Sequence, residues 1–163
     1  MKVAFCFPGQ GSVEPGMGRE IADAVAEARA VYARGSAASN LDLERLCFHG
    51  DASELLDTAV QQPALVATSL AMLAAIRARG IEPDYVIGHS VGEFAAIAAC
   101  GAMSDEEAIA LVRERGIAMA EAAARHPGSM AAILGLVLAG SVADDDGRAG
   151  APQLERDRTA DPS

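Results

Sequence analysis

The sequence is poor in aromatic residues and has no cluster of positive charge. Its 163 residues include no Trp, two Tyr and four Phe, whereas apolar residues make up 51% and many of these are Ala. A chain of this length forms one domain at most, so we expect helices of small side chains packed on a modest sheet. The formal net charge of −10 argues against nucleic acid and anionic membrane surfaces as partners.

Cysteine and long hydrophobic runs are also scarce. Cys6, Cys47 and Cys100 are widely spaced in apolar stretches, which predicts reduced thiols in the core of a cytoplasmic protein. The sequence contains no Cys-pair or His-rich spacing of the kind that would indicate a metal site. No signal peptide is expected, and the longest weakly polar stretch, residues 63–76, is too short to span a bilayer.

Strand-like runs alternate with helical patterns, which predicts an α/β fold with a largely parallel sheet. The expected strands cover residues 3–7, 85–87 and 129–137, and the first is apolar enough to be buried on both faces. The expected helices cover residues 17–34 (ending before Gly35), 41–47, 53–60, 63–79 and 104–124. Pro63 would begin the fourth helix and Gly80 would terminate it, and Ser104 with Glu107 would form a capping box at the fifth.

The character of the sequence changes after about Gly140, where it becomes polar, charged and aperiodic. Such a segment cannot bury enough apolar area to offset the entropy lost on ordering. We therefore divide the chain into a domain at residues 1–137 and a disordered tail at residues 138–163.

A Gly-x-Ser-x-Gly pattern, Gly88-His89-Ser90-Val91-Gly92, lies between an expected strand and an expected helix. This context is typical of a nucleophile elbow. The glycines allow a sharp turn with a positive φ, and the helix that follows would direct its free N–H groups at an oxyanion beside the Ser90 hydroxyl. An ordinary Gly/Ser turn before a helix is the alternative interpretation.

Five segments, taken in order, resemble the acyltransferase family of malonyl-CoA:acyl-carrier-protein transacylases, which is related to the acyltransferase domains of polyketide synthases. The segments are Phe7-Pro8-Gly9-Gln10-Gly11-Ser12, Gln62-Pro63-Ala64-Leu65, Gly88-His89-Ser90-Val91-Gly92-Glu93, Arg115-Gly116 and Met130-Ala131-Ala132-Ile133-Leu134-Gly135-Leu136. The similarity covers residues 1 to about 137. It implies an α/β-hydrolase-like core that stops before a small ferredoxin-like subdomain is complete.

The resemblance also implies roles for particular residues. Ser90 would attack the thioester of malonyl-CoA, and the backbone N–H groups of Gln10 and Val91 would form the oxyanion hole. Arg115 would bind the free malonyl carboxylate with two N–H groups, and Gln62 would order the site through hydrogen bonds. The malonyl group would then pass to the phosphopantetheine thiol of acyl carrier protein by ping-pong kinetics, without a cofactor or a metal.

Residue type alone leaves other interpretations open. Arg115 is more typical of a solvated helix charge, Gln10 of a turn residue, and Gln62 fits a helix-cap neighbour as well as a site residue. His89 is not expected to act as the base, because adjacent residues on a tight elbow point apart.

The sequence departs from the family beyond residue 137. The family's catalytic His lies in a later, Ser-His-like segment that this chain ends before reaching, so we expect weak or no activity from this chain alone. Back-translation of residues 152–161 with one base dropped permits Asn-x-Asn-x-Thr-Gly-Gln-x-Ile. The family carries a similar Asn-x-Asn-x-Pro-Gly-Gln-x-Val, which leads to the hypothesis of a frameshifted or decayed gene.

Two other functions stay open at this point. A serine hydrolase or thioesterase would use the same elbow, although Arg115 and the opening glycine-rich segment argue against it. A non-catalytic fragment would bind carrier protein, or a partner that supplies the missing half. The motifs that set the choice between malonyl and methylmalonyl groups lie in the absent region.

Overall fold

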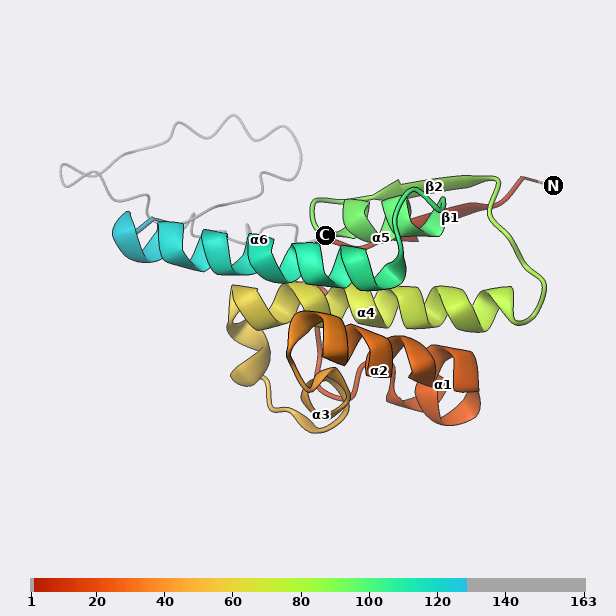
Figure 1. Ribbon diagram of the computed structural model, residues 1–163, viewed down its shortest axis with the longest axis horizontal. Coiled ribbons are helices and arrows are strands. Elements are labelled where there is room, and N and C mark those ends of the chain that lie inside the picture. The colour runs from red at the N-terminus through yellow and green to blue at the C-terminus, as the bar shows by residue number, and fades with distance from the viewer. Residues whose placement is uncertain (1, 129–163) are drawn as a thin grey trace, which may run out of the picture. The chain divides into compact units, whose positions relative to one another are not determined.

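The computed structural model describes residues 2–128, which belong to one compact unit (Figure 1). The predicted strand at 129–137 and the predicted tail at 138–163 lie outside the described residues. The elements, in order, are β1 (Ala4–Phe7), α1 (Arg19–Ala24), α2 (Ala26–Ser39), α3 (Leu43–His49), the 3-10 helix η1 (Glu54–Leu56), α4 (Thr58–Arg77), β2 (Tyr85–Gly88), α5 (Gly92–Ala99) and α6 (Asp105–Arg125). The described part is therefore helix-rich with a small parallel sheet.

The two strands pair in parallel, with Phe7 opposite Gly88 at their carboxyl ends. Their opposite ends are joined through Asp84, which accepts hydrogen bonds from the Lys2 ammonium at 2.7 Å and from the Val3 amide at 2.8 Å. These bonds hold the pKa of the Asp84 carboxyl below its ordinary value. The pairing brings the loop after β1 and the loop after β2 to the same edge of the sheet.

The prediction that the first strand is buried on both faces is wrong. Helix α5 packs on one face of both strands, whereas Cys6 on β1 is exposed. The neighbouring side chains Tyr85 and Ile87 on β2 are 60% and 58% exposed. Apolar content alone did not distinguish a strand covered on one face from one covered on both, because nothing among residues 2–128 covers this second face.

Helix α4 lies between α2 and α6 in Figure 1 and runs antiparallel to both. It begins at Thr58, where the Asp57 side chain caps the Ala59 amide at 2.9 Å. The predicted helix start at Pro63 is therefore wrong, and the predicted helix at 53–60 is replaced by η1 and the first turn of α4.

Pro63 is tolerated inside α4 because a side chain of α6 replaces the backbone hydrogen bond that the proline removes. Proline has no N–H, so the carbonyl four residues earlier, that of Ala59, loses its helical donor. That carbonyl instead accepts a hydrogen bond from Nη1 of Arg113 on α6 at 2.5 Å. The proline thus gives α6 a docking point on α4.

The first helical segment also differs from its prediction. Val25 is extended, with φ −135° and ψ 115°, and separates α1 from α2. Gly35 does not end the helix but lies buried within α2, where an added Cβ would approach Cδ1 of Ile109 on α6 to 2.7 Å. Helix α2 instead ends at Ser39, and the residue that caps it, Asn40, adopts the left-handed conformation at φ 54°.

The last described helix follows its prediction closely. The Ser104 hydroxyl accepts from the Glu107 amide at 3.1 Å and the Glu107 carboxylate accepts from the Ser104 amide at 2.8 Å, which completes the capping box. Helix α3 begins in a similar way, with the Asp42 side chain accepting from the Arg45 amide at 3.0 Å.

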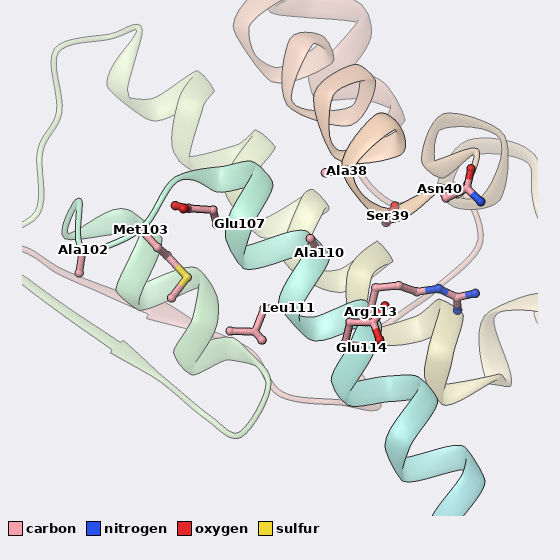
Figure 2. A pocket seen from close by; sticks show the side chains of 10 residues that line it. All are labelled: Ala38, Ser39, Asn40, Ala102, Met103, Glu107, Ala110, Leu111, Arg113 and Glu114. Atoms are coloured by element: carbon pink, nitrogen blue, oxygen red, sulfur yellow. The ribbon is translucent and has the colours of Figure 1, made fainter.

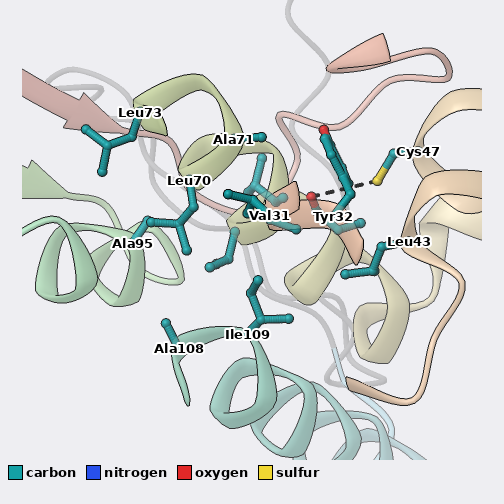
Figure 3. Close-up of a cluster of buried hydrophobic side chains, with 14 of the residues drawn as sticks. Val31, Tyr32, Leu43, Cys47, Leu70, Ala71, Leu73, Ala95, Ala108 and Ile109 are labelled. Atoms are coloured by element: carbon teal, nitrogen blue, oxygen red, sulfur yellow. Dashed lines mark hydrogen bonds between the residues drawn. The ribbon is translucent and has the colours of Figure 1, made fainter. Parts of the chain in front are cut away.

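The core is centred on α4, and α2, α3, α5 and α6 each pack buried side chains against it (Figure 3). One of its buried polar groups, the Tyr32 hydroxyl, donates a hydrogen bond to Thr68 Oγ1 at 2.8 Å. Burial raises the pKa of the Cys47 thiol to about 12. Cys47 is thus a buried thiol as predicted, whereas the prediction is wrong for Cys6 and Cys100, which are exposed free thiols.

Helix α4 is longer than the apolar stretch identified in the sequence, and its 20 residues are long and apolar enough to cross a membrane. Within its most apolar window, however, 78% of the helix is buried inside the described unit. The packing is that of a core helix.

Candidate active site

Ser90 sits in a strained turn between β2 and α5. Its φ is +54°, a left-handed conformation that non-glycine residues seldom adopt, and its side chain is exposed. A Cβ at Gly88 would collide with the backbone of Gly92, and a Cβ at Gly92 would lie 2.5 Å from the carbonyl oxygens of Phe7 and Pro8. Both glycines are required by this close approach, which confirms the predicted elbow geometry.

The backbone amides that follow Ser90 form the first hydrogen-bonded turn leading into α5. The Gly92 amide donates to the His89 carbonyl at 2.9 Å and the Glu93 amide donates to the Ser90 carbonyl at 3.1 Å. Val91 is fully buried, and its own amide N–H has no acceptor among residues 2–128. This N–H belongs to the residue that directly follows Ser90 in the chain.

The loop after β1 packs directly against the elbow. A Cβ at Gly9 would collide with the His89 ring and would lie 2.9 Å from the His89 carbonyl oxygen. The next residue, Gln10, is exposed, and its amide N–H likewise has no acceptor within the described range. The Gln10 side chain donates from Nε2 to Thr58 Oγ1 at 2.5 Å.

Arg115 joins two of the other predicted site residues. Its Nη1 donates to Gln62 Oε1 at 2.5 Å, and its Nη2 donates to Ser90 Oγ at 3.3 Å. Its guanidinium carbon lies 6.0 Å from the centre of the Phe94 ring on α5, within range of a cation–π contact. Ser90 lies in the turn before α5, Gln62 on α4 and Arg115 on α6, yet the three side chains meet at one place.

The packing of α4 on α6 creates this meeting point. An added Cβ at Gly116 would lie 2.6 Å from the Thr58 carbonyl oxygen, so only glycine lets the two helices approach this closely. Gln62 is fully buried, and its Nε2 donates to Met119 Sδ at 3.3 Å. The Arg115-Gly116 pair therefore combines a charged side chain with the small residue that positions it.

Several neighbours of the site were not identified from the sequence. Thr58 precedes Gln62 by one helical turn, and Phe94 follows Ser90 by one turn into α5, so helical spacing was the signal for both. Met119 likewise follows Arg115 by one turn of α6. No His, Asp or Glu side chain within residues 2–128 forms a hydrogen bond with Ser90 Oγ, and His49 and His126 are exposed at helix ends.

An open depression of about 670 Å³ lies elsewhere, between the end of α2 and the outer face of α6 (Figure 2). Its charged side chains are Glu107, Arg113 and Glu114. The first belongs to the capping box and the second to the bond with the Ala59 carbonyl. Its one hydroxyl group, that of Ser39, is buried and donates to the Gly35 carbonyl at 2.7 Å, so Ser90 remains the candidate nucleophile.

Between residues 2 and 128, no group of three His, Cys, Asp or Glu side chains is close enough to hold a metal ion.

Comparison with known proteins agrees with the motif resemblance. A family model described as acyl transferase domain matches residues 4–151. The malonyl CoA-acyl carrier protein transacylase of Bacillus subtilis (strain 168) is 45% identical over 135 residues, which cover 83% of this chain and 43% of that protein. The crystal structure of MCAT from Mycobacterium tuberculosis is 38% identical with a TM-score of 0.73, over 78% of this chain and 43% of that chain.

A third relative is a malonyl-transacylase solved in complex with a type II PKS acyl-carrier protein. It is 36% identical with a TM-score of 0.71, over 75% of this chain and 40% of that chain. This chain therefore spans less than half the length of these relatives and corresponds to their N-terminal part. Because the family model matches most of its residues, the chain belongs to the acyl transferase domain family.

Proposed function

We propose that this chain carries the nucleophile and carboxylate-binding half of an acyltransferase that moves a malonyl group from malonyl-CoA to acyl carrier protein, as in fatty-acid biosynthesis. The observation that carries the proposal is the bridge from Ser90 Oγ through the Arg115 guanidinium to Gln62 Oε1. A serine hydroxyl beside a guanidinium suits an acyl group that bears its own carboxylate. The names of the relatives supply the same substrate class.

The first half-reaction would acylate Ser90. Its Oγ forms a bond to the carbonyl carbon of the malonyl thioester, the carbon–sulfur bond breaks, and the hydroxyl proton ends on the sulfur of coenzyme A, which leaves as a thiol. The intermediate oxyanion would accept hydrogen bonds from the amide N–H groups of Val91 and Gln10. Loss of one such donor typically lowers the rate about 10²–10³-fold.

Arg115 would select for the malonyl group. Its bond to Gln62 is 2.5 Å and its bond to Ser90 is 3.3 Å, so the contact with Ser90 is the weaker of the two and the easier to exchange. A malonyl carboxylate would take the place of Ser90 Oγ on the guanidinium while Gln62 keeps the side chain in position. An acetyl group would leave the guanidinium without that partner, which is unfavourable in a partly buried site.

The second half-reaction would transfer the malonyl group from Ser90 to the phosphopantetheine thiol of acyl carrier protein. The complex of a related transacylase with a carrier protein supports this partner. Since no acid or base among residues 2–128 is bonded to Ser90, we expect slow, stoichiometric acylation rather than rapid turnover.

The finer architecture and location belong to the same proposal. A strand, a serine turn with a positive φ and a helix, in that order, support an α/β-hydrolase-like core. The match to less than half the length of the relatives supports a core without a complete ferredoxin-like subdomain. We also propose a cytoplasmic protein with reduced thiols and neither nucleic acid nor membrane as a partner.

Incubation with isotope-labelled malonyl-CoA tests the function directly. We expect label on the parent chain and on Ser53→Ala, a hydroxyl deletion in the loop before α4, but none on Ser90→Ala. In Arg115→Ala, malonyl labelling should fall about 10–100-fold, the scale of lost hydrogen bonds to a charged group, while acetyl labelling from acetyl-CoA is unchanged. Equal label on Ser90→Ala and the parent would refute the assignment of the nucleophile.

Addition of phosphopantetheine-bearing acyl carrier protein separates the alternatives. Label that moves to the carrier protein supports acyl transfer, and label released equally with and without carrier protein supports a hydrolase or thioesterase. Within residues 2–128 no base is hydrogen-bonded to Ser90, which favours, as the second candidate, a non-catalytic fragment that binds carrier protein. In that case the carrier protein binds but no label is ever found on Ser90.

A further inference from the structure

We infer that Thr58 is a positioning residue, which holds the Gln10 amide in place and ties it to the carboxylate-binding side of the site. This inference rests on the proposed function, in which the Gln10 N–H stabilises the oxyanion. Thr58 does not contact the reacting atoms, so it would act through Gln10.

Thr58 is itself firmly held at the start of α4. The preceding residue, Asp57, caps the helix through the Ala59 amide at 2.9 Å. The carbonyl oxygen of Thr58 faces Gly116, where an added Cβ would approach it to 2.6 Å. The residue before Gly116 is Arg115, so the backbone of Thr58 lies against the carboxylate-binding part of α6.

The Thr58 side chain faces the other part of the site. Its Oγ1 accepts a hydrogen bond from Gln10 Nε2 at 2.5 Å. One residue thus contacts the loop that carries the oxyanion donor with its hydroxyl, and the helix that carries the guanidinium with its backbone. The elbow also reaches both, through the close approach of Gly9 to His89 and the bond from Arg115 to Ser90. Among the residues that the structure describes, Thr58 is the one whose side chain hydrogen-bonds to Gln10 itself.

The Gln10 loop needs such an anchor because its own residues are permissive. Gln10 lies between Gly9 and Gly11, and Gly11 has φ +98°. Glycine loses more conformational freedom on ordering than any other residue, so a loop with two glycines is easily displaced. Among residues 9–12, the bond to Thr58 is the side-chain hydrogen bond that the structure records.

Loss of this bond should reduce the rate of acylation without weakening substrate binding. A displacement of about 1 Å in a catalytic group can lower a rate by about 10²-fold. The Arg115–Gln62 pair, which would bind the malonyl carboxylate, is bonded independently of Thr58 Oγ1. We therefore expect the maximal acylation rate constant to fall about 10–100-fold, with the malonyl-CoA concentration at half-maximal rate changed less than about twofold.

The test compares four single variants of the whole chain and the double variant that combines Thr58→Val with Gln10→Met. Thr58→Val removes the acceptor but keeps the shape, and Thr58→Ser keeps the hydroxyl. Gln10→Met removes the donor from the other side of the bond while it leaves the backbone amide and α4 intact. Ser53→Ala is the matched control, because it deletes a hydroxyl that bonds Asp51 rather than Gln10.

Two measurements decide the outcome. The first is single-turnover acylation of Ser90 by malonyl-CoA, followed by mass spectrometry over a range of concentrations. The second is the NMR order parameter of the Gln10 amide, expected to drop from about 0.85 in the parent to below about 0.6 in Thr58→Val and Gln10→Met. The second measurement does not depend on activity, so it decides the role of Thr58 even if Thr58→Val lowers stability or the parent is not acylated.

The inference is supported when Thr58→Val and Gln10→Met lose rate and rigidity together, Thr58→Ser and Ser53→Ala lose neither, and the double variant is no slower than the slower single variant. Parent-like rates and order parameters in Thr58→Val overturn it. If the parent is not acylated, the proposed function fails, and an unchanged order parameter at Gln10 separately rules out the anchoring role.

Discussion

The left-handed backbone at Ser90 leads to a stability prediction that needs no substrate. Ser90 has φ +54°, a conformation that costs an L-residue roughly 1–2 kcal/mol and that glycine adopts freely. Replacing Ser90 by glycine should therefore release strain that replacement by alanine retains. Both variants lose the hydroxyl and its 3.3 Å contact with Arg115, so that loss cancels in the comparison.

The size of the difference follows from two opposing effects. Relief of the left-handed strain favours Ser90→Gly over Ser90→Ala by roughly 1–2 kcal/mol. The greater freedom of glycine in the unfolded chain opposes this by about 0.5–1 kcal/mol. We therefore expect Ser90→Gly to be more stable by about 1 kcal/mol in free energy of unfolding, or about 2–5 °C in melting temperature.

Thermal unfolding followed by circular dichroism provides the assay, and Ser53 provides the control. Ser53 has an ordinary φ of −71°, and its hydroxyl contact with Asp51 is lost in both of its variants. At this position the order should reverse, with Ser53→Gly less stable than Ser53→Ala by about 0.5–1 kcal/mol. A melting temperature of Ser90→Gly equal to or below that of Ser90→Ala would show that Ser90 is not strained, and the elbow geometry would be refuted.

Three further predictions concern packing, thiol chemistry and pH. Gly116→Ala should destabilise the chain by about 1–3 kcal/mol in thermal unfolding, because its Cβ would lie 2.6 Å from a backbone oxygen of α4; an unchanged melting temperature would contradict this helix contact. With a thiol reagent at about pH 8, Cys6 and Cys100 should react at once and Cys47 only on unfolding, because burial raises the pKa of Cys47 to about 12; prompt reaction of all three would argue against the core packing. The amide and hydroxyl hydrogen bonds of the capping box hold the pKa of Glu107 below its ordinary value of 4.5, so its contribution is present above that pH and lost as the pH falls through the lowered pKa. The melting temperature of Glu107→Gln should therefore fall less between about pH 6 and about pH 3 than the melting temperature of the parent. An equal fall in both proteins would contradict this prediction.

The features predicted correctly from the sequence are those that neighbouring residues determine among themselves. The capping box at Ser104 requires only a hydroxyl and a carboxylate three residues apart. The turn at Ser90 requires glycines two residues away on each side, and both proved to be sterically necessary. Such signals survive in any tertiary context because the hydrogen bonds or close contacts that they create are local.

The predictions that were wrong depended on residues far away in the chain. A proline usually marks the beginning of a helix, yet α4 continues through Pro63 because Arg113 supplies the missing donor to the Ala59 carbonyl. A glycine often marks the end of a helix, yet α2 continues through Gly35, where the Ile109 side chain occupies the space beside the missing Cβ. Each exception is compensated by α6, whose position local patterns do not reveal.

The candidate site combines both kinds of information. Ser90 could be identified from its own pentapeptide, but Arg115 had no local feature that distinguished it from a solvated helix charge, and only the family resemblance singled it out. The distinguishing feature is Gly116, which lets α6 approach α4 until the guanidinium reaches both Gln62 and Ser90. A charged residue next to a helix glycine becomes informative once that glycine is seen to face another backbone, because close helix contact then forces the adjacent side chain into a shared, partly buried space.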